Sequence, residues 1–292
     1  MFERISRSWQ LIKASWGVLK QDKHLLVFPL ISALAALIVV VSFALPVLGL
    51  GALGALDGVS ETDSTAVPVL TYALGFVFYI SLYFVIFFFN AALVGAAMIR
   101  LDGGAPTVSD GLRVARSKFM SILGYAVIAA TVGMLLRIIQ ERVGFVGGLV
   151  VSLLGVGWTM ATYLVVPTLV ASDVGPLDAV KESATILKKT WGENVVGQAG
   201  MGAVFALIHF VNIAIGVLLV VLFASAGLGS MGTMALIGLS ITASVCMVVL
   251  IALVQSALGG IYAAALYRYA TLGKVSEGFD NQAMELAFAP KR

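Results

Sequence analysis

Residues 68–99, PVLTYALGFVFYISLYFVIFFFNAALVGAAMI, decide the class of this chain. The stretch contains no Asp, Glu, Lys or Arg. It is longer than the roughly 20 residues that a helix needs to cross about 30 Å of hydrocarbon. Its apolar character is continuous, whereas the strands of a membrane barrel alternate, so the stretch predicts a transmembrane helix.

The rest of the chain has the same character. Of its 292 residues, 60% are apolar and 11% are charged, and the mean hydropathy is +1.05. A soluble domain carries about 25% charged residues, so this composition excludes a soluble enzyme, a nucleic-acid-binding module and a disordered scaffold. The single cysteine, Cys246, excludes a disulfide framework, and His24 and His209 lack the spacing of metal ligands. We expect no enzymatic activity, no cofactor, no metal and no nucleic-acid partner.

Six apolar runs are long enough to cross a bilayer. They predict an all-α polytopic membrane domain over residues 1–272, with transmembrane helices at 25–50, 68–99, 120–136, 145–171, 195–226 and 233–267. Several runs exceed the minimum length, so we expect them to tilt or to project beyond the bilayer. Pro167, near the end of the fourth run, predicts a bend there.

The basic residues predict the orientation. Sixteen of the 18 Lys and Arg residues lie on one side of the predicted spans, and only Arg137 and Arg142 lie on the other. The positive-inside rule then places both termini in the cytoplasm of a cell membrane. Residues 273–292 form a cytoplasmic tail, which either docks on that face or is disordered.

A segment before each odd-numbered span predicts an amphipathic helix in the membrane interface. The three segments are 2–20, 106–119 and 176–191, and cap-like Thr107 and Ser109 begin the second. Each has an apolar stripe at helical spacing, with cations on the other face. In the first segment the stripe is Ile5, Trp9, Ile12, Trp16 and Leu19. We expect membrane lipids as partners and Trp9, Trp16, Phe119 and Trp191 as interfacial anchors.

The first and third of these segments also resemble each other. Residues 8–16, SWQLIKASW, align with residues 183–191, SATILKKTW, at Ser, an aliphatic pair, Lys, Ser/Thr and Trp. The match suggests three units, each an interfacial helix followed by a helical hairpin. The alternative is that interfacial helices converge on Lys and Trp, and the unequal spacing between copies leaves both readings open.

Four long strings give the chain a family resemblance. They are FERISRSWQLIKASWGVLKQDKHLLVFPL, FNAALVGAAMIRLDGGAPTVSDGLRVA with ILGYAVIAATVG, PLDAVKESATILKKTWGENVVG, and LYRYATLGKVSEGFD. They resemble an uncharacterised family of bacterial and archaeal six-span membrane proteins, a domain of unknown function. More loosely, an interfacial helix that leads into a hairpin is similar to the membrane domain attached to some glycerophosphodiester phosphodiesterases. The resemblance implies the six-span fold and carries over no functional residue.

Four polar residues fall inside the predicted spans and form a candidate intramembrane site: Asn90, His209, Asn212 and Gln255. Counted from the span ends, three of them lie at similar depth, so we expect the set to converge. One interpretation is a solute path with His209 as a proton carrier, and the other is interhelical hydrogen bonding. No charged residue lies deep in a span, which weighs against a coupled transporter.

Two functional hypotheses follow from these patterns. The first is a non-enzymatic protein that binds or organises lipid at the cytoplasmic leaflet. The alternative is a channel or facilitator for an uncharged or lipidic solute. The aromatic-rich second span, with six phenylalanines and two tyrosines between residues 76 and 89, either packs and faces lipid or forms an acyl-chain groove.

Overall fold

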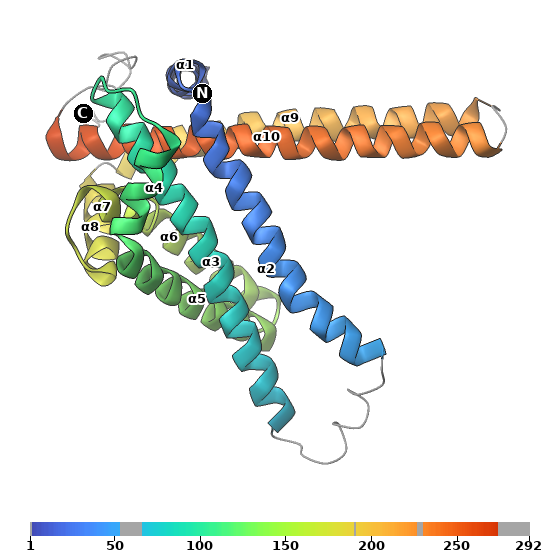
Figure 1. The fold of residues 1–292 in the computed structure, drawn as a ribbon, viewed down its shortest axis with the longest axis horizontal. Coiled ribbons are helices and arrows are strands. Elements are labelled where there is room, and N and C mark those ends of the chain that lie inside the picture. The colour runs from blue at the N-terminus through green and yellow to red at the C-terminus, as the bar shows by residue number, and fades with distance from the viewer. Residues whose placement is uncertain (1, 53–65, 190, 227–229, 274–292) are drawn as a thin grey trace.

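The computed structural model describes residues 2–52, 66–189, 191–226 and 230–273 (Figure 1). Side chains are described for all of these except residues 2–11, 47–52, 66–71, 189, 191–200 and 230. Every regular element in the described part is a helix. In chain order the helices are α1 Phe2–Gln21, the short 3-10 helix η1 Lys23–Leu26, α2 Val27–Ala52, α3 Ala66–Leu101, α4 Val108–Ser117, α5 Phe119–Arg142, α6 Phe145–Ala161, α7 Val165–Ala171, α8 Pro176–Lys189, α9 Trp191–Ser225 and α10 Ser230–Leu272.

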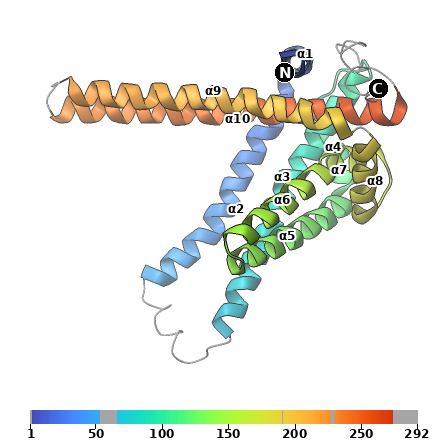
Figure 2. The same cartoon turned by 180° about the vertical axis from the view of Figure 1, so that it is seen from behind.

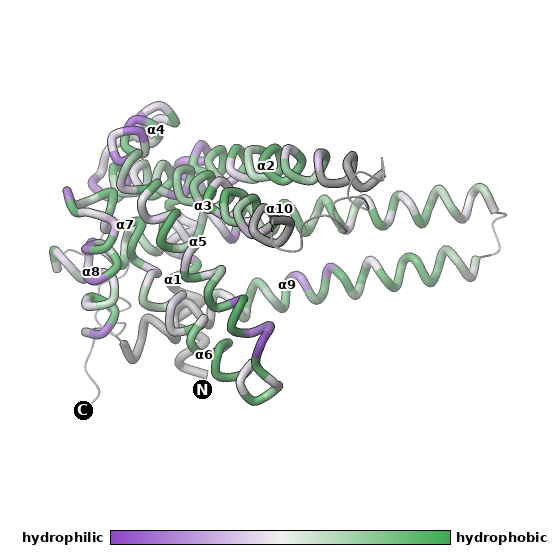
Figure 3. The backbone as a smooth tube through the Cα atoms, turned by 90° about the horizontal axis from the view of Figure 1, so that it is seen from below, coloured by the Kyte–Doolittle hydropathy of each residue, from purple (hydrophilic) through white to green (hydrophobic). Residues whose placement is uncertain are grey.

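Six stretches of the described chain are long and apolar enough to cross a membrane. They are Lys23–Pro46, Tyr72–Leu101, Phe119–Arg142, Phe145–Ala171, Met201–Ser225 and Met231–Leu272. Many large apolar side chains on their outward faces are exposed, as expected for surfaces that contact the acyl chains of lipids. Figure 3 shows hydrophilic residues at α4, at α8 and where α5 ends beside α6, while the long helices are mainly hydrophobic. The predicted all-α, six-span fold is confirmed.

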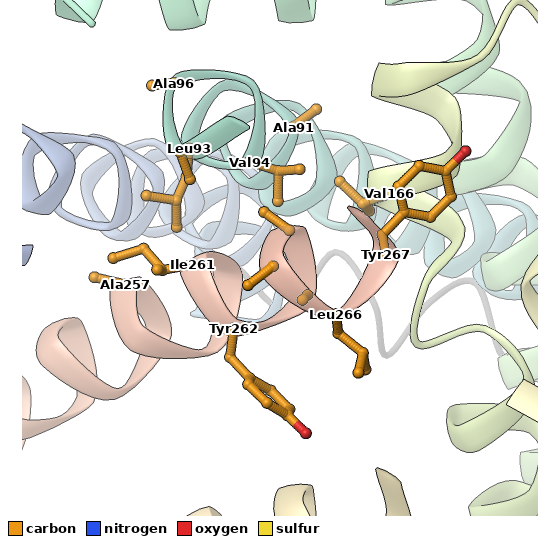
Figure 4. Close-up of a cluster of buried hydrophobic side chains, with 14 of the residues drawn as sticks. Ala91, Leu93, Val94, Ala96, Val166, Ala257, Ile261, Tyr262, Leu266 and Tyr267 are labelled. Carbon is orange, nitrogen blue, oxygen red and sulfur yellow. The ribbon is translucent and has the colours of Figure 1, made fainter. Parts of the chain in front are cut away.

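The core lies where α3 crosses α10. Residues 91–97 of α3 and 260–268 of α10 are all buried, and alanine is the most frequent residue in each stretch. Small side chains let the two backbones approach closely: a Cβ added at Gly260 would lie 2.5 Å from Leu93 Cδ2. Figure 4 shows Ala257 and Ile261 beside Leu93, whereas Tyr262 points away from α3. This crossing fixes α10 against the other long helices.

The α9–α10 hairpin is longer than one bilayer needs. Its helices have 35 and 43 residues, which is roughly 52 and 64 Å at 1.5 Å per residue. Figures 1 and 2 show the hairpin running across the ends of α2 and α3 and projecting away from them. Because the hydrocarbon layer is only about 30 Å thick, such a hairpin fits within it only when strongly tilted.

The fourth predicted span is two helices. α6 ends at Ala161 and α7 begins at Val165, so the helix is interrupted three to five residues before Pro167. Proline cannot donate a hydrogen bond, and its ring crowds the carbonyl four residues earlier, which is that of Tyr163. The predicted bend at Pro167 is thus a break in the preceding turn.

The amphipathic segments differ from prediction at their ends and on their apolar faces. α4 ends at Ser117, because Lys118 has non-helical dihedral angles, and Phe119 begins α5 instead of closing α4. Trp191 likewise begins α9. Of the stripe residues of α1 whose side chains are described, Ile12 and Leu19 are buried in the protein core, whereas Trp16 is exposed. The location of the helices in a membrane interface stays a prediction.

The predicted start of α4 is confirmed at Thr107. The Thr107 Oγ1 atom accepts a hydrogen bond from the Asp110 backbone N–H, and the Asp110 carboxylate accepts one from the Thr107 backbone N–H at 3.0 Å. This is a reciprocal capping box. Hydrogen bonds from Thr107 also lower the pKa of the Asp110 carboxyl, which keeps it charged at the helix N-terminus.

Candidate functional site

The structure does not gather the four predicted intramembrane polar residues into one site. Asn212 is used within the hairpin, where its Nδ2 donates to the Ser244 backbone oxygen at 3.1 Å. Asn90 lies at the α3–α10 crossing, where its Oδ1 would be 3.4 Å from a Cβ added at Gly260. Ser244 and Gly260 are 16 residues apart on α10, or roughly 24 Å. The two asparagines therefore lie at very different levels of the hairpin.

Gln255 and His209 lie near different asparagines. Gln255 precedes Gly260, which marks the level of Asn90, by five residues on α10, or roughly 7.5 Å, whereas His209 precedes Asn212 by almost one turn of α9. Both side chains are half-buried. The hydrogen bond of Asn212 favours the interhelical interpretation for that residue, and the roles of the other three stay predictions.

Ser183 of α8 repairs the break between α6 and α7. Its Oγ accepts a hydrogen bond from the Leu164 backbone N–H at 3.1 Å and donates one to the Ala161 backbone oxygen at 2.7 Å. Ser183 and Leu164 are both fully buried. A helix can be broken within the membrane only where neighbouring groups form hydrogen bonds with the freed backbone groups. Ser183 forms these hydrogen bonds here.

Charged residues join the helix ends at one end of the bundle. We call the six that form ion pairs there the first belt: Asp22, Arg100, Asp102, Lys118, Asp173 and Arg268. Arg100 Nε lies 3.0 Å from Asp22 Oδ2 and so ties α3 to the end of α1. Lys118 Nζ donates to the Ser172 backbone oxygen at 3.0 Å and to the Asp173 carboxylate. That hydrogen bond lowers the pKa of the Asp173 carboxyl, so the pair is charged at neutral pH.

Arg268 is the most buried member of the first belt. Only 7% of the residue is exposed, and its NH2 atom donates to Asp102 Oδ1. Its NH1 atom is buried and has no hydrogen-bond partner. Next to it, the Tyr267 hydroxyl lies 3.0 Å from Ser172 Oγ, which joins α10 to the end of α7.

A second group of polar residues lies at the opposite end of the bundle. We call Tyr79, Arg137 and Glu141 the second belt, because Arg137 hydrogen-bonds both of the others. Tyr79 and Arg100 are 21 residues apart on α3, or roughly 31 Å. Lys118 and Arg137 are 19 residues apart along α5, or roughly 28 Å. The two belts are therefore separated by about the thickness of the hydrocarbon layer.

Near the first belt, α1 presents an aromatic ring and a cation outward. Gln21, the last residue of α1, accepts a hydrogen bond from Arg100, which places this end of the helix at the first belt. Trp16, five residues earlier, is 39% exposed, and Lys20 Nζ lies 5.7 Å from its ring centroid. In the same turns, Val18 and Leu19 are buried in the core. The Trp16–Lys20 pair is thus held outward by a firmly packed helix.

Phe119 is the other predicted anchor whose side chain is described, and at 40% it is as exposed as Trp16. Its ring packs at 4.9 Å from that of Phe84 on α3. The side chains of Trp9 and Trp191 are outside the described part of the structure.

Residues 69–278 match the family of unknown function DUF6159. The chain belongs to this family. The match runs from the start of α3 past the end of α10 and leaves out α1 and α2. In this DUF6159 protein, the match therefore includes every residue of the two belts except Asp22. No curated protein and no solved structure matches the chain. The looser similarity to the membrane domain of glycerophosphodiester phosphodiesterases stays a prediction.

Sequence reasoning missed the residues that hold this DUF6159 protein together at the break and at the first belt. Pro167 was a visible signal for the break, but nothing in the sequence marked Ser183 as its partner. Arg268 and Asp102 lie 166 residues apart, so their pairing depends on the α3–α10 crossing, which hydropathy does not reveal.

We expect the substitution Ser183→Ala to destabilise the protein by about 1–3 kcal/mol, because it leaves the buried Leu164 N–H and the partly buried Ala161 carbonyl without their partner. The matched control is Thr185→Ala on the same helix, whose exposed hydroxyl bonds only its own helix at Lys181. Unfolding in detergent micelles, followed by circular dichroism, measures both. Equal stability of the two variants would show that Ser183 does not support the break.

Proposed function

We propose that this protein is a non-enzymatic membrane protein that binds anionic lipids at the cytoplasmic leaflet and organises the membrane around it. The observation that carries this proposal is the Trp16–Lys20 pair, which α1 holds outward beside the first belt. Tryptophan favours the headgroup level of a bilayer, and lysine next to it attracts anionic headgroups.

The charges around α1 support an anionic partner. Lys13, Lys23 and Arg116 are exposed, and none of them has an ion-pair partner among the described residues. The acidic residues Asp22, Asp102 and Asp173 are already paired with the cations of the first belt. Lys13 and Lys23, both within seven residues of the exposed tryptophan, therefore carry positive charge without an acidic partner in the described part of the chain, and Arg116 adds another such charge on α4. If the first belt lies at the cytoplasmic surface, these cations face the leaflet that carries anionic lipid.

A solute path has less support. The candidate polar residues lie at different levels along the α9–α10 hairpin. The side-chain amide of Asn212 already donates a hydrogen bond to the Ser244 backbone oxygen. By contrast, a lipid-binding role needs only the outward surface of α1.

The proposal is tested by the lipid selectivity of the full protein in vesicles of mixed phosphatidylglycerol and phosphatidylcholine. Electron spin resonance with spin-labelled lipids counts each lipid at the protein surface. A basic residue near an anionic surface contributes about 1 kcal/mol, a factor of about five. We expect phosphatidylglycerol to be preferred, and the double variant Lys13→Gln/Lys20→Gln to reduce that preference at least about threefold at low salt.

The matched control is Lys13→Arg/Lys20→Arg, which keeps both charges and should keep the preference. Raising the salt concentration should reduce the preference of the wild-type protein, because the exposed charges are screened. Equal association of the two lipids with the wild-type protein at low salt would overturn the proposal.

A further inference from the structure

The second belt contains an exposed guanidinium with unused hydrogen-bond donors. Arg137 NH1 donates to the Tyr79 hydroxyl at 2.9 Å, and Arg137 Nε donates to Glu141 Oε1 at 2.9 Å. The side chain of Arg137 is 64% exposed. A guanidinium has five N–H groups, so three of them remain for a ligand. Tyr79 accepts from Arg137, which leaves its own O–H free to donate.

An aromatic ladder leads from this belt into the bundle. The Tyr79 and Tyr83 rings stack at 6.1 Å, Tyr83 and Phe87 at 5.7 Å, and Phe87 stacks on Tyr125 of α5 at 4.5 Å. The ladder follows the seam between α3 and α5, where Gly133 leaves room for Tyr83: a Cβ there would lie 3.3 Å from the Tyr83 hydroxyl. Tyr79, Tyr83 and Phe87 are only half-buried, so one side of the ladder is open.

The second belt and the aromatic ladder lie at the levels of a phospholipid headgroup and of its acyl chains, respectively. The second belt lies about one hydrocarbon thickness from the first, which is the level of the opposite headgroups. Tyr79 to Phe87 spans eight residues of α3, or roughly 12 Å into the hydrocarbon. A polar donor cluster at the surface thus continues into an apolar aromatic face below it.

We propose that the α3–α5 seam binds one phospholipid of the leaflet opposite to α1, with its phosphate on Arg137 and Tyr79 and one acyl chain along the Tyr79–Tyr83–Phe87 ladder. The free N–H groups of Arg137 and the O–H of Tyr79 donate to the phosphate oxygens. The acyl chain covers the open side of the aromatic rings.

The charge of Glu141 sets the specificity of this site. It balances the charge of Arg137, so recognition depends on hydrogen bonds to the phosphodiester that all phospholipids share. The seam therefore accepts zwitterionic and anionic headgroups alike. In this respect it differs from the proposed surface of α1, where the preference for anionic lipid depends on uncompensated lysines.

The test uses phosphatidylcholine with a photoreactive diazirine in its acyl chain, added to the full protein in nanodiscs. Mass spectrometry of the digested protein locates the labelled residues. We expect labelling in the 79–87 and 125–137 segments. The variants Arg137→Gln and Tyr79→Phe should each reduce that labelling at least about fivefold, since each removes donors to the phosphate.

Matched controls lie close by in both helices. Arg142→Gln removes an exposed cation from the last turn of α5, and Tyr72→Phe removes an exposed hydroxyl from α3. Both should label like the wild type. Thermal unfolding of each variant identifies any loss that comes from misfolding, and Arg137→Lys, which keeps a phosphate donor, should recover part of the labelling.

The outcomes separate this site from the one proposed on α1. The double variant Lys13→Gln/Lys20→Gln should leave the labelling unchanged, and photoreactive phosphatidylglycerol should label the seam to within about threefold of phosphatidylcholine. Inorganic phosphate should not compete, because it lacks the acyl chain. Labelling that is absent in the wild type, persists in folded Arg137→Gln, or is abolished by inorganic phosphate would overturn the proposal.

Discussion

Replacing Asp102 with Ala is expected to destabilise the protein much more than replacing its ion-pair partner Arg268 with Met. The asymmetry follows from unequal burial: Arg268 is 7% exposed, whereas the Asp102 side chain is 66% exposed. Without Asp102, a buried guanidinium has no counter-charge, and removing one partner of a buried pair costs about 3 kcal/mol or more. Without the guanidinium, Asp102 is left in contact with water.

The buried NH1 atom of Arg268 adds to this difference. It has no hydrogen-bond partner, so the substitution to Met removes an unsatisfied donor and keeps most of the apolar packing. We expect Arg268→Met to change the free energy of unfolding by less than about 1 kcal/mol, and the double variant to resemble Arg268→Met alone.

Unfolding in detergent micelles measures the three variants side by side. The control is Asp178→Ala, which breaks an ion pair with Lys181 in which both side chains are largely exposed, and which should cost less than about 1 kcal/mol. If Asp102→Ala were no more harmful than Asp178→Ala, the first belt would not stabilise the α3–α10 junction.

The second large effect is expected for Gly111→Ala, which should release α4 from α3. A Cβ at Gly111 would lie 2.5 Å from the Phe28 ring and 2.6 Å from the Ala92 backbone oxygen. The ring can turn away, but the backbone oxygen is part of helix α3 and cannot. Overpacking of this kind costs about 3 kcal/mol, more than the helix propensity that alanine gains.

Gly17→Ala provides the matched control, because a Cβ at Gly17 has no atom within 4 Å. There the gain in helix propensity should leave stability unchanged or raise it by up to about 1 kcal/mol. Hydrogen–deuterium exchange resolves the two sites, and faster exchange confined to α4 is expected for Gly111→Ala. An unchanged exchange rate in α4 would mean that α4 does not depend on this close approach.

The sequence predicts the membrane fold well because hydropathy measures apolar character, which is the property that a helix needs in the hydrocarbon layer. The runs at 68–99 and 145–171 appear as Tyr72–Leu101 and Phe145–Ala171, and the first amphipathic segment, 2–20, is α1 Phe2–Gln21. The cap at Thr107 was also predictable, since its chemistry is local. These features depend on neighbours in the sequence.

The candidate site was not predictable in the same way, because depth was counted separately along each helix. Asn90 and His209 were expected at similar depth only on the assumption that every span crosses the bilayer at a similar angle. The α9–α10 hairpin is too long for that and runs across the other helices (Figures 1 and 2). Equal residue counts on helices of different tilt do not give equal depth.

Contact between anionic lipid and α1 is tested most directly at Trp16 itself. In the variant Trp9→Phe/Trp158→Phe/Trp191→Phe, Trp16 is the sole tryptophan. Its fluorescence is compared in vesicles that contain phosphatidylglycerol or phosphatidylcholine brominated close to the headgroup. We expect brominated phosphatidylglycerol to quench more strongly at low salt, and the difference to vanish with Lys13→Gln/Lys20→Gln. Equal quenching by both lipids at low salt would contradict the proposal that α1 binds anionic lipid.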